Sequence, residues 1–518
     1  MTAGVLLAAC SKEPVKPSWD VDLMVPLVKT SMTIGDLVAD SLLSTAEDGQ
    51  VSLLYTSRLF DLRLDTVLTA PDTSFRYTYG LPIPGPISFP AGATFNTSND
   101  VTRFELDGLE LRRLRIRSGQ VSMSISNRIN GVINGHFGLP GATLDGEPFI
   151  IDQLVPPGTP SDPGTVTSTR SMDGYDLDMR GPAHNEVNTL ATALSYSNAD
   201  ENSVSVTSDD SLIAVVSYQD IVPDYALGYF GTRIVHVDPS STELDLFNNL
   251  SGVLDVDQVT AHLKVANGIG VDARADLLYI RSVNSRTGNT VDLSHPIISA
   301  PINLDRALDL GNTFQEAHND FTLTETNSNI DVFLENLPDR IDYALDVTID
   351  PLGDVSNGHD FLYYESTLHG DLELEVPLRI VANDLTLVKE TTVALPGDAR
   401  SAIRSMLLHV FAVNGFPFDA EIHLDIIDDA GEVVSTLPVS GTVATAITGL
   451  DGLVQAPVAT ELNTTLTADQ ADRLNAGDRL RITAVFNTAM QPEHVRILAN
   501  YMLDLQVTAE GNYIVNGE

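Results

Sequence analysis

The sequence predicts a mainly β protein, built from several antiparallel β-sandwich-like modules with a few short helices. Short runs of alternating apolar and polar residues favour half-buried strands, and Gly, Pro, Asn and Asp separate these runs. Clear examples of this alternation are residues 121–127, 371–376, 420–426 and 503–507. The chain has 518 residues, which is too long for one small core and indicates more than one domain.

Composition and charge exclude several classes of protein. Acidic residues outnumber basic ones by 71 to 29, so the formal net charge is −42. A surface of this sign repels a phosphate backbone, and we therefore expect no nucleic-acid partner. No apolar run reaches the length of about 18 residues that a membrane-spanning helix needs. Cysteine occurs once, which excludes a disulfide within the chain.

The first residues carry the most specific motif of the sequence. A short apolar run ends in Leu7-Ala8-Ala9-Cys10 and is followed by Ser-Lys-Glu-Pro. This motif resembles the lipobox of bacterial lipoproteins. The resemblance implies that residues 1–9 are a truncated signal, that cleavage precedes Cys10, and that this cysteine carries acyl chains. Acyl chains hold a soluble domain on a bilayer, because each buried methylene contributes about 0.8 kcal/mol.

Residues 10–18 then comprise the lipidated cysteine and a tether. Two prolines in the tether, Pro14 and Pro17, favour an extended spacer. Lys12-Glu13 is similar to the short export signal of some Gram-negative surface lipoproteins. We therefore expect membrane attachment through Cys10 and a location at the outer membrane, on its periplasmic or extracellular face.

Three short helices and one tight turn interrupt the predicted strands. Residues 33–43 predict a helix because a capping-box-like pair precedes apolar residues that share one face. Residues 396–408 and 467–477 predict two more, each beginning at a residue suited to cap a helix. Residues 428–432 lie between two apolar strands and are typical of a hairpin turn.

A faint repeat suggests duplicated modules. In three places a strand ends at an asparagine near a glycine and a second apolar strand follows, at Asn127, Asn267 and Asn414. Asn and Gly tolerate positive φ, so each pair is suited to bend a strand from one sheet to another. The unequal separations exclude a solenoid, and the short pattern resembles segments of late-embryogenesis-abundant-type β-sandwich domains and of tubular lipid-binding proteins.

The predicted division of the folded chain is sequential. It comprises a β-rich N-terminal domain at residues 19–240, a middle β domain at 241–350 and C-terminal β structure at 351–518. Composition changes support these limits only weakly, because no long linker separates the three ranges.

One loop offers oxygen ligands for a metal ion. Asp350, Asp354, Asn357 and Asp360 lie within eleven residues of a glycine-containing segment. Calcium takes six to eight oxygen ligands, so this loop is a candidate calcium site. The same residue types are also usual in loops that bind nothing. No other cofactor is expected.

Two segments are candidate binding surfaces. Residues 112–117 form the densest basic segment, and as a strand they point Arg113, Arg115 and Arg117 to one face. These arginines suit an anionic glycan or an acidic protein partner, or they pair with the protein's own carboxylates. The densest aromatic segment suits ring stacking on a ligand or packing in the core, and its tyrosines are Tyr218, Tyr225 and Tyr229.

The sequence favours a function in binding rather than catalysis. It contains no nucleophile elbow, zinc-binding helix motif or phosphate-binding loop, so we do not predict an enzyme. We expect a lipid-anchored cell-envelope protein with a binding, adhesion or structural role. Two alternatives stay open: an envelope carrier of lipids or other amphiphiles with an apolar groove between its strands, and a surface polysaccharide hydrolase with a pair of carboxylates in a cleft.

Overall fold

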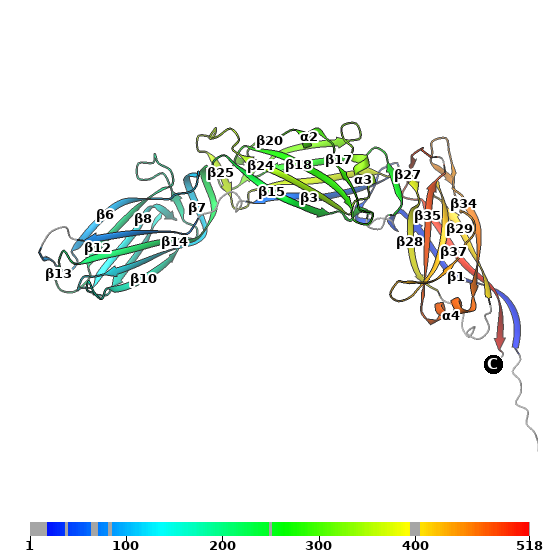
Figure 1. Ribbon diagram of the computed structural model, residues 1–518, viewed down its shortest axis with the longest axis horizontal. Coiled ribbons are helices and arrows are strands. Elements are labelled where there is room, and N and C mark those ends of the chain that lie inside the picture. Colours follow the sequence, from blue (N-terminus) through cyan, green and yellow to red (C-terminus); the bar gives the residue numbers. More distant parts are fainter. Residues whose placement is uncertain are drawn as a thin grey trace, which may run out of the picture.

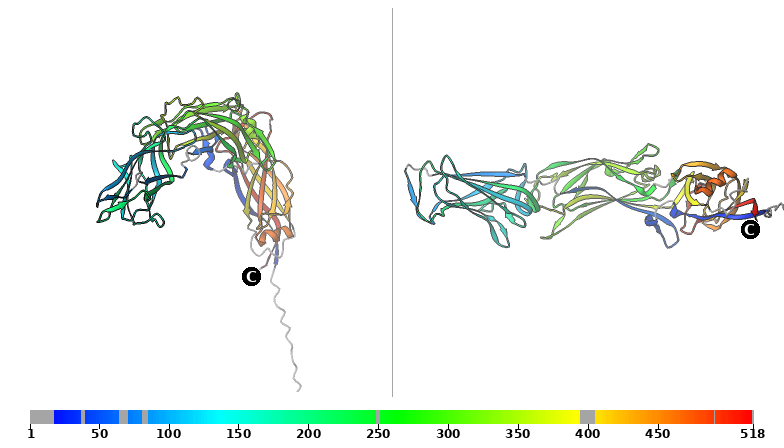
Figure 2. Two further views of the ribbon diagram at one scale, coloured as in Figure 1. Left: turned by 60° about the vertical axis from the view of Figure 1, so that its left-hand side comes forward. Right: turned by 90° about the horizontal axis from the view of Figure 1, so that it is seen from below.

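The computed structural model describes residues 18–36, 40–63, 71–80, 85–247, 251–393, 405–489 and 491–516. These residues form antiparallel β-sheets with a few short helices, which confirms the predicted fold class. Three modules follow one another along a curved body, and Figures 1 and 2 show this arch from different directions. We name the modules proximal, middle and distal, and the proximal module is the one that contains the first and last described strands.

The proximal module is a sandwich of two four-stranded sheets. One sheet has the order β1 (Ser18–Thr33), β37 (Met502–Asn516), β29 (Ser405–Asn414) and β34 (Val458–Thr467). The other has the order β28 (Leu385–Thr392), β35 (Arg479–Thr488), β30 (Phe418–Ile427) and β31 (Val433–Leu437). Helix α4 (Ala468–Ala476) and the hairpin β32 (Ile447–Thr448) and β33 (Val454–Ala456) complete the module.

The middle module is also a sandwich of two sheets, each with five strands. One sheet has the order β2 (Leu43–Thr45), β3 (Val51–Arg63), β26 (Thr367–Pro377), β17 (Thr260–Asn267) and β23 (Ala317–Thr324). In the other, β15 (Arg233–Glu243) pairs with β24 (Arg340–Ile349), β24 with β18 (Ala273–Asn284), and β18 with β19 (Asn289–Asp292) and β20 (Ile302–Leu304). The short helices are α2 (Pro296–Ser299) and α3 (Ile330–Glu335).

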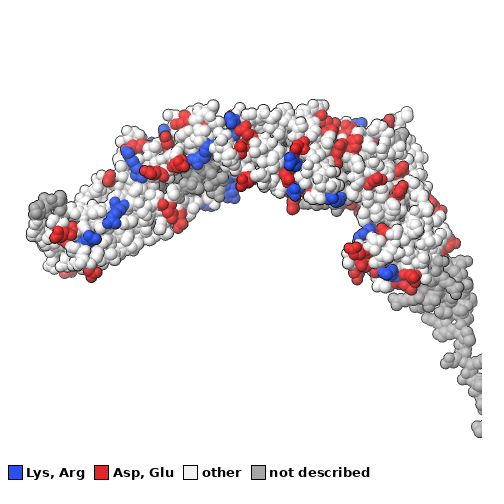
Figure 3. Space-filling view, viewed as in Figure 1, with Lys and Arg blue, Asp and Glu red and all other residues white. Residues whose placement is uncertain are grey.

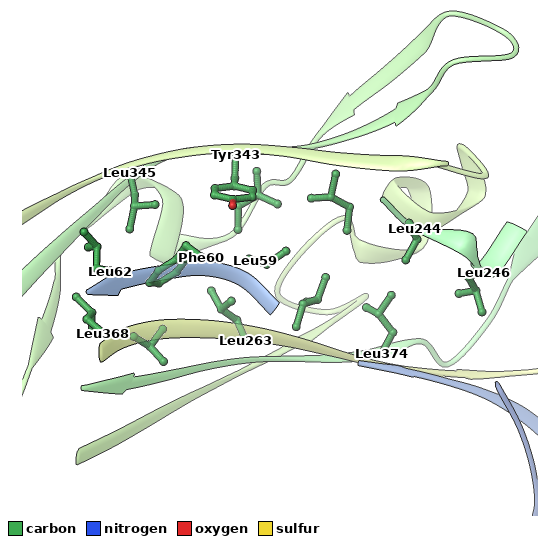
Figure 4. Close-up of a cluster of buried hydrophobic side chains, with 14 of the residues drawn as sticks. Leu59, Phe60, Leu62, Leu244, Leu246, Leu263, Tyr343, Leu345, Leu368 and Leu374 are labelled. Atoms are coloured by element: carbon green, nitrogen blue, oxygen red, sulfur yellow. The ribbon is translucent and has the colours of Figure 1, made fainter. Parts of the chain in front are cut away.

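Apolar side chains from both sheets of the middle module meet in its core. Phe60 and Leu62 of β3 and Leu368 of β26 point towards Leu345 of the facing strand β24 (Figure 4). Each of these side chains is at most 8% exposed. Burial of such a side chain contributes about 1.5–3 kcal/mol, so the core holds the two layers together.

The distal module again has two layers. In one layer β4 (Thr73–Gly80) pairs with β14 (Ser211–Tyr229), β14 with β7 (Glu110–Asn127), and β7 with β10 (Gly164–Ser171). In the other, β6 (Thr94–Arg103) pairs with β12 (Thr189–Asn198), β12 with β8 (Ile133–Leu144), and β8 with β9 (Glu147–Val155). Strand β11 (Asp176–Asp178) pairs with both β7 and β8, and β5 (Ile87–Phe89) pairs with β13 (Val204–Val206).

The modules are nested within one another in the sequence. The first long strand of each module pairs with its last strand, as β1 does with β37, β3 with β26 and β4 with β14. The chain leaves the proximal module after β1 and the middle module after β3, completes the distal module, and then returns. The sheets therefore do not follow the predicted ranges 19–240, 241–350 and 351–518, because antiparallel pairing joins Ser18 to Asn516.

The repeated asparagines are buried and make the same contacts in all three modules. Each side chain accepts a hydrogen bond from the N–H two residues later and donates to the carbonyl four residues later and to one further loop carbonyl. For Asn267 the partners are Ile269, Val271 and Asp305, at 2.9–3.0 Å. Asn127 bonds to Ile129, Gly131 and Pro156, and Asn414 bonds to Phe416, Phe418 and Ala444. Each asparagine thus lies at a bend between the two sheets, as the repeat predicted. The predicted reason was wrong, because neither these asparagines nor the glycines beside them have a positive φ, and the side-chain hydrogen bonds hold the bend instead.

The helix predictions are correct in part. The helix predicted at 467–477 is present as α4, which Thr467 and Gln470 begin with a capping box. Residues 428–432 form the predicted turn, which joins β30 to β31. Where a helix was predicted at 33–43, the described residues form two 3-10 turns, at Ile34–Asp36 and Asp40–Leu42, and residues 37–39 lie outside the described residues. The helix predicted at 396–408 is wrong from residue 405 onward, where pairing with β34 and β37 makes the segment strand β29. Residues 394–404 lie outside the described residues.

Replacing Asn267 with alanine should destabilise the middle module. The change leaves two buried carbonyls and one buried N–H without their partner, and each unsatisfied group costs about 1–3 kcal/mol. We expect a lower melting temperature in calorimetry and faster hydrogen exchange in β17 and β18. The exposed Asn303 of β20 is the matched control, and equal losses for N267A and N303A would contradict the proposed role.

The nested order also predicts that residues 71–232 fold on their own. The strands β4, β6–β10, β12 and β14 pair with one another within this range, and the end of β14 has one further partner outside it, at residues 360–363. We expect a cooperative thermal transition and a β-type circular dichroism spectrum from this fragment. As a control, residues 19–240, which contain β1 and β3 without β37 and β26, should expose unpaired strands and aggregate.

Candidate functional site at the junction of the distal and middle modules

A strand of the middle module extends a sheet of the distal module. β25 (Asp360–Tyr363) pairs with the end of β14, so that Tyr363 lies opposite Tyr225 and Asp360 opposite Gly228. β14 pairs with β7 on its other side. Figure 1 shows β25 beside this end of the distal module. We call the region around β25 and the facing ends of β7 and β14 the junction.

A half-buried carboxylate links aromatic side chains from both modules at the junction. The hydroxyls of Tyr225 and Tyr363 each donate a hydrogen bond of 2.8 Å to Asp309, one to each carboxylate oxygen. Asp309 lies on β21 (Leu308–Asp309), which pairs with β22 (Phe314–Gln315) of the middle module. Tyr225, Tyr363 and Phe361 form a small buried cluster separate from the main core. The two modules therefore share a packed and hydrogen-bonded contact.

The three predicted arginines lie at this junction. Arg113, Arg115 and Arg117 alternate with buried Leu114 and Ile116, as the strand pattern predicted. Their contacts agree with the second interpretation of the basic segment, which is pairing with the protein's own carboxylates. Arg113 binds Asp176, Arg115 binds Asp224 at 2.7 Å, and Arg117 lies 3.4 Å from Glu365. Arg117 also lies 3.9 Å from the ring centroid of Tyr364, so it contacts the middle module.

The predicted tyrosines do not present an aromatic surface. Tyr218 and Tyr225 are only 4% and 5% exposed, because β14 is a central strand of its sheet. Tyr229 is half-buried, and its hydroxyl lies 3.2 Å from the hydroxyl of Thr232. The rings of Tyr218 and Tyr225 therefore pack inside the protein and cannot stack on a ligand in this conformation.

A cavity of about 580 Å³ opens beside the row of arginines. Its wall contains Arg112 and Arg113 of β7, the β11–β12 loop with Arg180 and His184, and His359 from the middle module. A second hollow of about 750 Å³ shares Asp176, Asp178 and His184 with the first. The two hollows adjoin and together form a groove across the end of the distal module.

The three carboxylates that line the first cavity, those of Asp176, Asp178 and Glu186, are each bound to an arginine. Arg180 binds Asp178 through two hydrogen bonds of 2.7 and 2.8 Å. These bonds lower the pKa of Asp178 to about 2, against the opposing effect of its partial burial. A carboxylate with this pKa stays ionised at neutral pH and is poorly suited to act as a general acid.

Sequence reasoning missed Arg112, Arg180, His184 and His359 as members of one site. Arg180 and His184 are separated from the end of β7 by more than fifty residues of chain, and His359 belongs to another module. Arg112 was within the basic segment, but simple alternation assigns it to the opposite face from Arg113. A break in strand register at Arg112 brings both into the wall of the cavity, and no sequence signal predicted that break.

The four predicted metal ligands fall into two separate groups. Asp350 and Asp360 are buried, at 1% and 0% exposure, whereas Asp354 and Asn357 are exposed. The Asp354 carboxylate accepts a hydrogen bond of 2.7 Å from the Gly358 N–H and so closes its own loop. Within the described ranges, no group of three or more His, Cys, Asp or Glu side chains is placed to hold a metal ion.

The buried carboxylate pair is electrostatically unfavourable when both groups are ionised. Both oxygens of Asp350 and one oxygen of Asp360 have no hydrogen-bonding partner, and Arg306 contacts the other Asp360 oxygen. Burial, followed by the charge of Asp360, raises the pKa of Asp350 to about 7. Near neutral pH, Asp350 therefore holds a proton readily.

Comparison with known proteins adds little to this geometry. No family model and no curated protein matches the chain. Among solved structures, the chain is similar to a Parabacteroides distasonis protein described as secreted, with 14% sequence identity and a TM-score of 0.28. The match covers 54% of this chain and 83% of the other. In the described part of the chain, no helix has the length and apolar character required to cross a membrane.

Replacing Asp350 with asparagine should change how stability depends on pH. The pKa of Asp350 is raised from 3.8 to about 7 in the folded protein, so its stabilising effect is full below pH 3.8 and is lost as the pH rises to 7. We expect D350N and the wild type to melt at similar temperatures at about pH 4, and D350N to melt higher at about pH 8.

The exposed Asp354 provides the control, because D354N leaves the buried pair in place. Melting curves at both pH values should separate D350N from the wild type only at the higher pH. A constant difference between D350N and the wild type at both values would contradict the raised pKa.

Proposed function

We propose that this chain is a lipid-anchored arm of the cell envelope that carries a binding module at its far end. The multi-module β architecture is compatible with an envelope or secreted protein, and the lipid anchor at Cys10 is an inference from the sequence motif. Cys10 itself lies outside the described residues. The proposal places the membrane next to the proximal module.

The position of the first described residue carries this proposal. Ser18 pairs with Asn516 at the end of the proximal module, and the distal module lies at the opposite end of the arch (Figure 1). An anchor joined to Ser18 by a short tether therefore leaves the distal module as the part furthest from its attachment. Two chain segments join each pair of adjacent modules, which restricts bending more than a single linker does.

The surface suits a protein that works in water beside a membrane. Acidic and basic side chains are interspersed over the distal and middle modules (Figure 3). The large excess of acidic residues opposes adsorption to anionic lipid, so the arm should stand away from the bilayer unless its anchor holds it.

The described cavities favour binding over the two alternative functions. The apolar cavity between the sheets of the distal module holds only about 50 Å³, whereas ligand pockets usually hold about 300–1,000 Å³. A carrier of lipids needs a larger apolar groove. In the polar groove, Asp176 and Asp178 are each bound to an arginine, which does not suit the acid–base pair of a hydrolase.

Replacing Cys10 with serine should release the protein from the membrane. Serine cannot receive the thioether-linked lipid, so the full-length precursor expressed in its native host should move to the soluble fraction. The measurement is immunoblotting of membrane and soluble fractions after a high-salt wash. S18A is the control and should stay in the membrane fraction, and sedimentation of C10S with the washed membranes would refute the anchor.

A further inference from the structure

A β-bulge places Arg112 in the junction cavity. On β14, Leu227 lies opposite Arg113 and the next residue, Gly228, lies opposite Leu111, so Arg112 is an extra residue of β7. An extra residue breaks the alternation of side chains and turns its own side chain to a new direction. Gly228 permits this arrangement, because a Cβ there would lie 2.2 Å from the Glu110 carbonyl oxygen.

The middle module holds the Arg112 side chain from the other side. Its guanidinium lies against Gly358, where a Cβ would come within 2.4 Å of the Arg112 Cζ. Gly358 has a φ of +70°, and the adjacent His359 also lines the cavity. Arg112 is thus positioned by both modules, and the cavity is complete only when they are together.

Arg112 differs from its neighbours in its charge partners. Arg113 is bound to Asp176, Arg180 to Asp178, and Glu186, the third carboxylate of the cavity wall, to Arg103, so these six groups compensate one another. Among the described residues, no carboxylate pairs with Arg112. In a chain with 71 acidic and 29 basic residues, an arginine without such a partner is a local excess of positive charge. A guanidinium in this state is suited to bind the carboxylate of a ligand with two parallel hydrogen bonds.

The rest of the cavity suits hydroxyl groups. His184, Asn185 and His359 provide donors and acceptors, and the arginine-bound Asp176 and Asp178 can accept further hydrogen bonds. No Phe, Tyr or Trp is among the residues that line either hollow, which disfavours recognition by stacking on a large aromatic ring. The volume of about 580 Å³ fits a small polar molecule, and the adjoining hollow extends the groove for a longer chain.

From this geometry we propose that the junction groove binds an acidic oligosaccharide, with the carboxylate of a uronic acid residue paired to Arg112 and sugar hydroxyls bound to the surrounding polar side chains. The inference rests on the binding role proposed for the distal module and names its ligand class. It does not depend on the membrane anchor, because the site lies entirely within the described distal and middle modules.

Calorimetric titration of the full chain carrying C10S tests the proposal in solution. The probe is trigalacturonic acid, and the matched neutral probe is its methyl ester, which keeps the hydroxyls and removes the charge. We expect the acid to bind the parent protein, and the ester to bind it at least about tenfold more weakly. We expect the same loss of affinity when the acid binds R112A, because a hydrogen-bonded charge pair is lost in each case. R112K should retain part of the affinity, because lysine keeps the charge without the two-pronged geometry.

Two controls separate binding from folding. Arg76 is an exposed arginine of β4 in the same module, and R76A should bind like the parent protein. H359A removes an exposed ring from the cavity wall and should weaken binding severalfold without lowering the melting temperature, which keeps the test valid if R112A does not fold.

Several outcomes would overturn the proposal. The first is that the parent protein does not bind trigalacturonic acid, and the second is that it binds the acid and its ester equally well. The others are an equal loss of affinity for the acid in R76A and R112A, and tighter binding of a polyglutamate peptide than of the sugar acid. A failure of this kind leaves the anchor untouched, since membrane fractionation of C10S measures the anchor separately.

Discussion

The pairing of first and last strands is the constraint on which the architecture depends. Because β1 pairs with β37, the two ends of the proximal module meet, and everything between them must leave the sandwich and return to it. The same holds for β3 with β26 and for β4 with β14. The middle and distal modules are therefore each inserted after the first long strand of the preceding module, and two chain segments cross every junction. A binding module at the far end of such an arm is connected to its base more stiffly than one on a single linker.

Buried asparagines in every module form hydrogen bonds with backbone groups at the point where the chain passes between the two sheets. A chain that passes from one sheet to the facing sheet leaves the hydrogen-bonding ladder and exposes backbone groups in the interior. The side chains of Asn127, Asn267 and Asn414 each satisfy one N–H and two carbonyls at this point. Asn198 makes the same local contacts, with the N–H of Asp200 and the carbonyl of Asn202, at the end of β12. An amide is the side chain suited to this role, because it has both an acceptor and two donor hydrogens.

The junction shows how a strongly acidic chain uses its few cations. Arg113, Arg115 and Arg117 bind carboxylates of the distal and middle modules, and Arg306 contacts the buried Asp360. The solvent-exposed pairs of Arg113, Arg115 and Arg117 contribute about 0–1 kcal/mol each, so their main effect is to orient the strands and the groove. Arg112 has a different role because the bulge and Gly358 hold it beside a cavity.

The sequence by itself determined the class of fold, several individual strands, the capped helix at 467–477 and the repeated asparagines. Alternation and capping are local properties, and residues within a few positions of one another decide them. The nesting of the modules and the groove were decided only by tertiary structure. Ser18 meets Asn516, and Arg112 meets His184 and His359, through pairings between strands that are far apart in the chain. Side-chain alternation does not reveal which distant strand is the partner, nor where a bulge turns one arginine towards a cavity, because both depend on the packing of the complete sandwich.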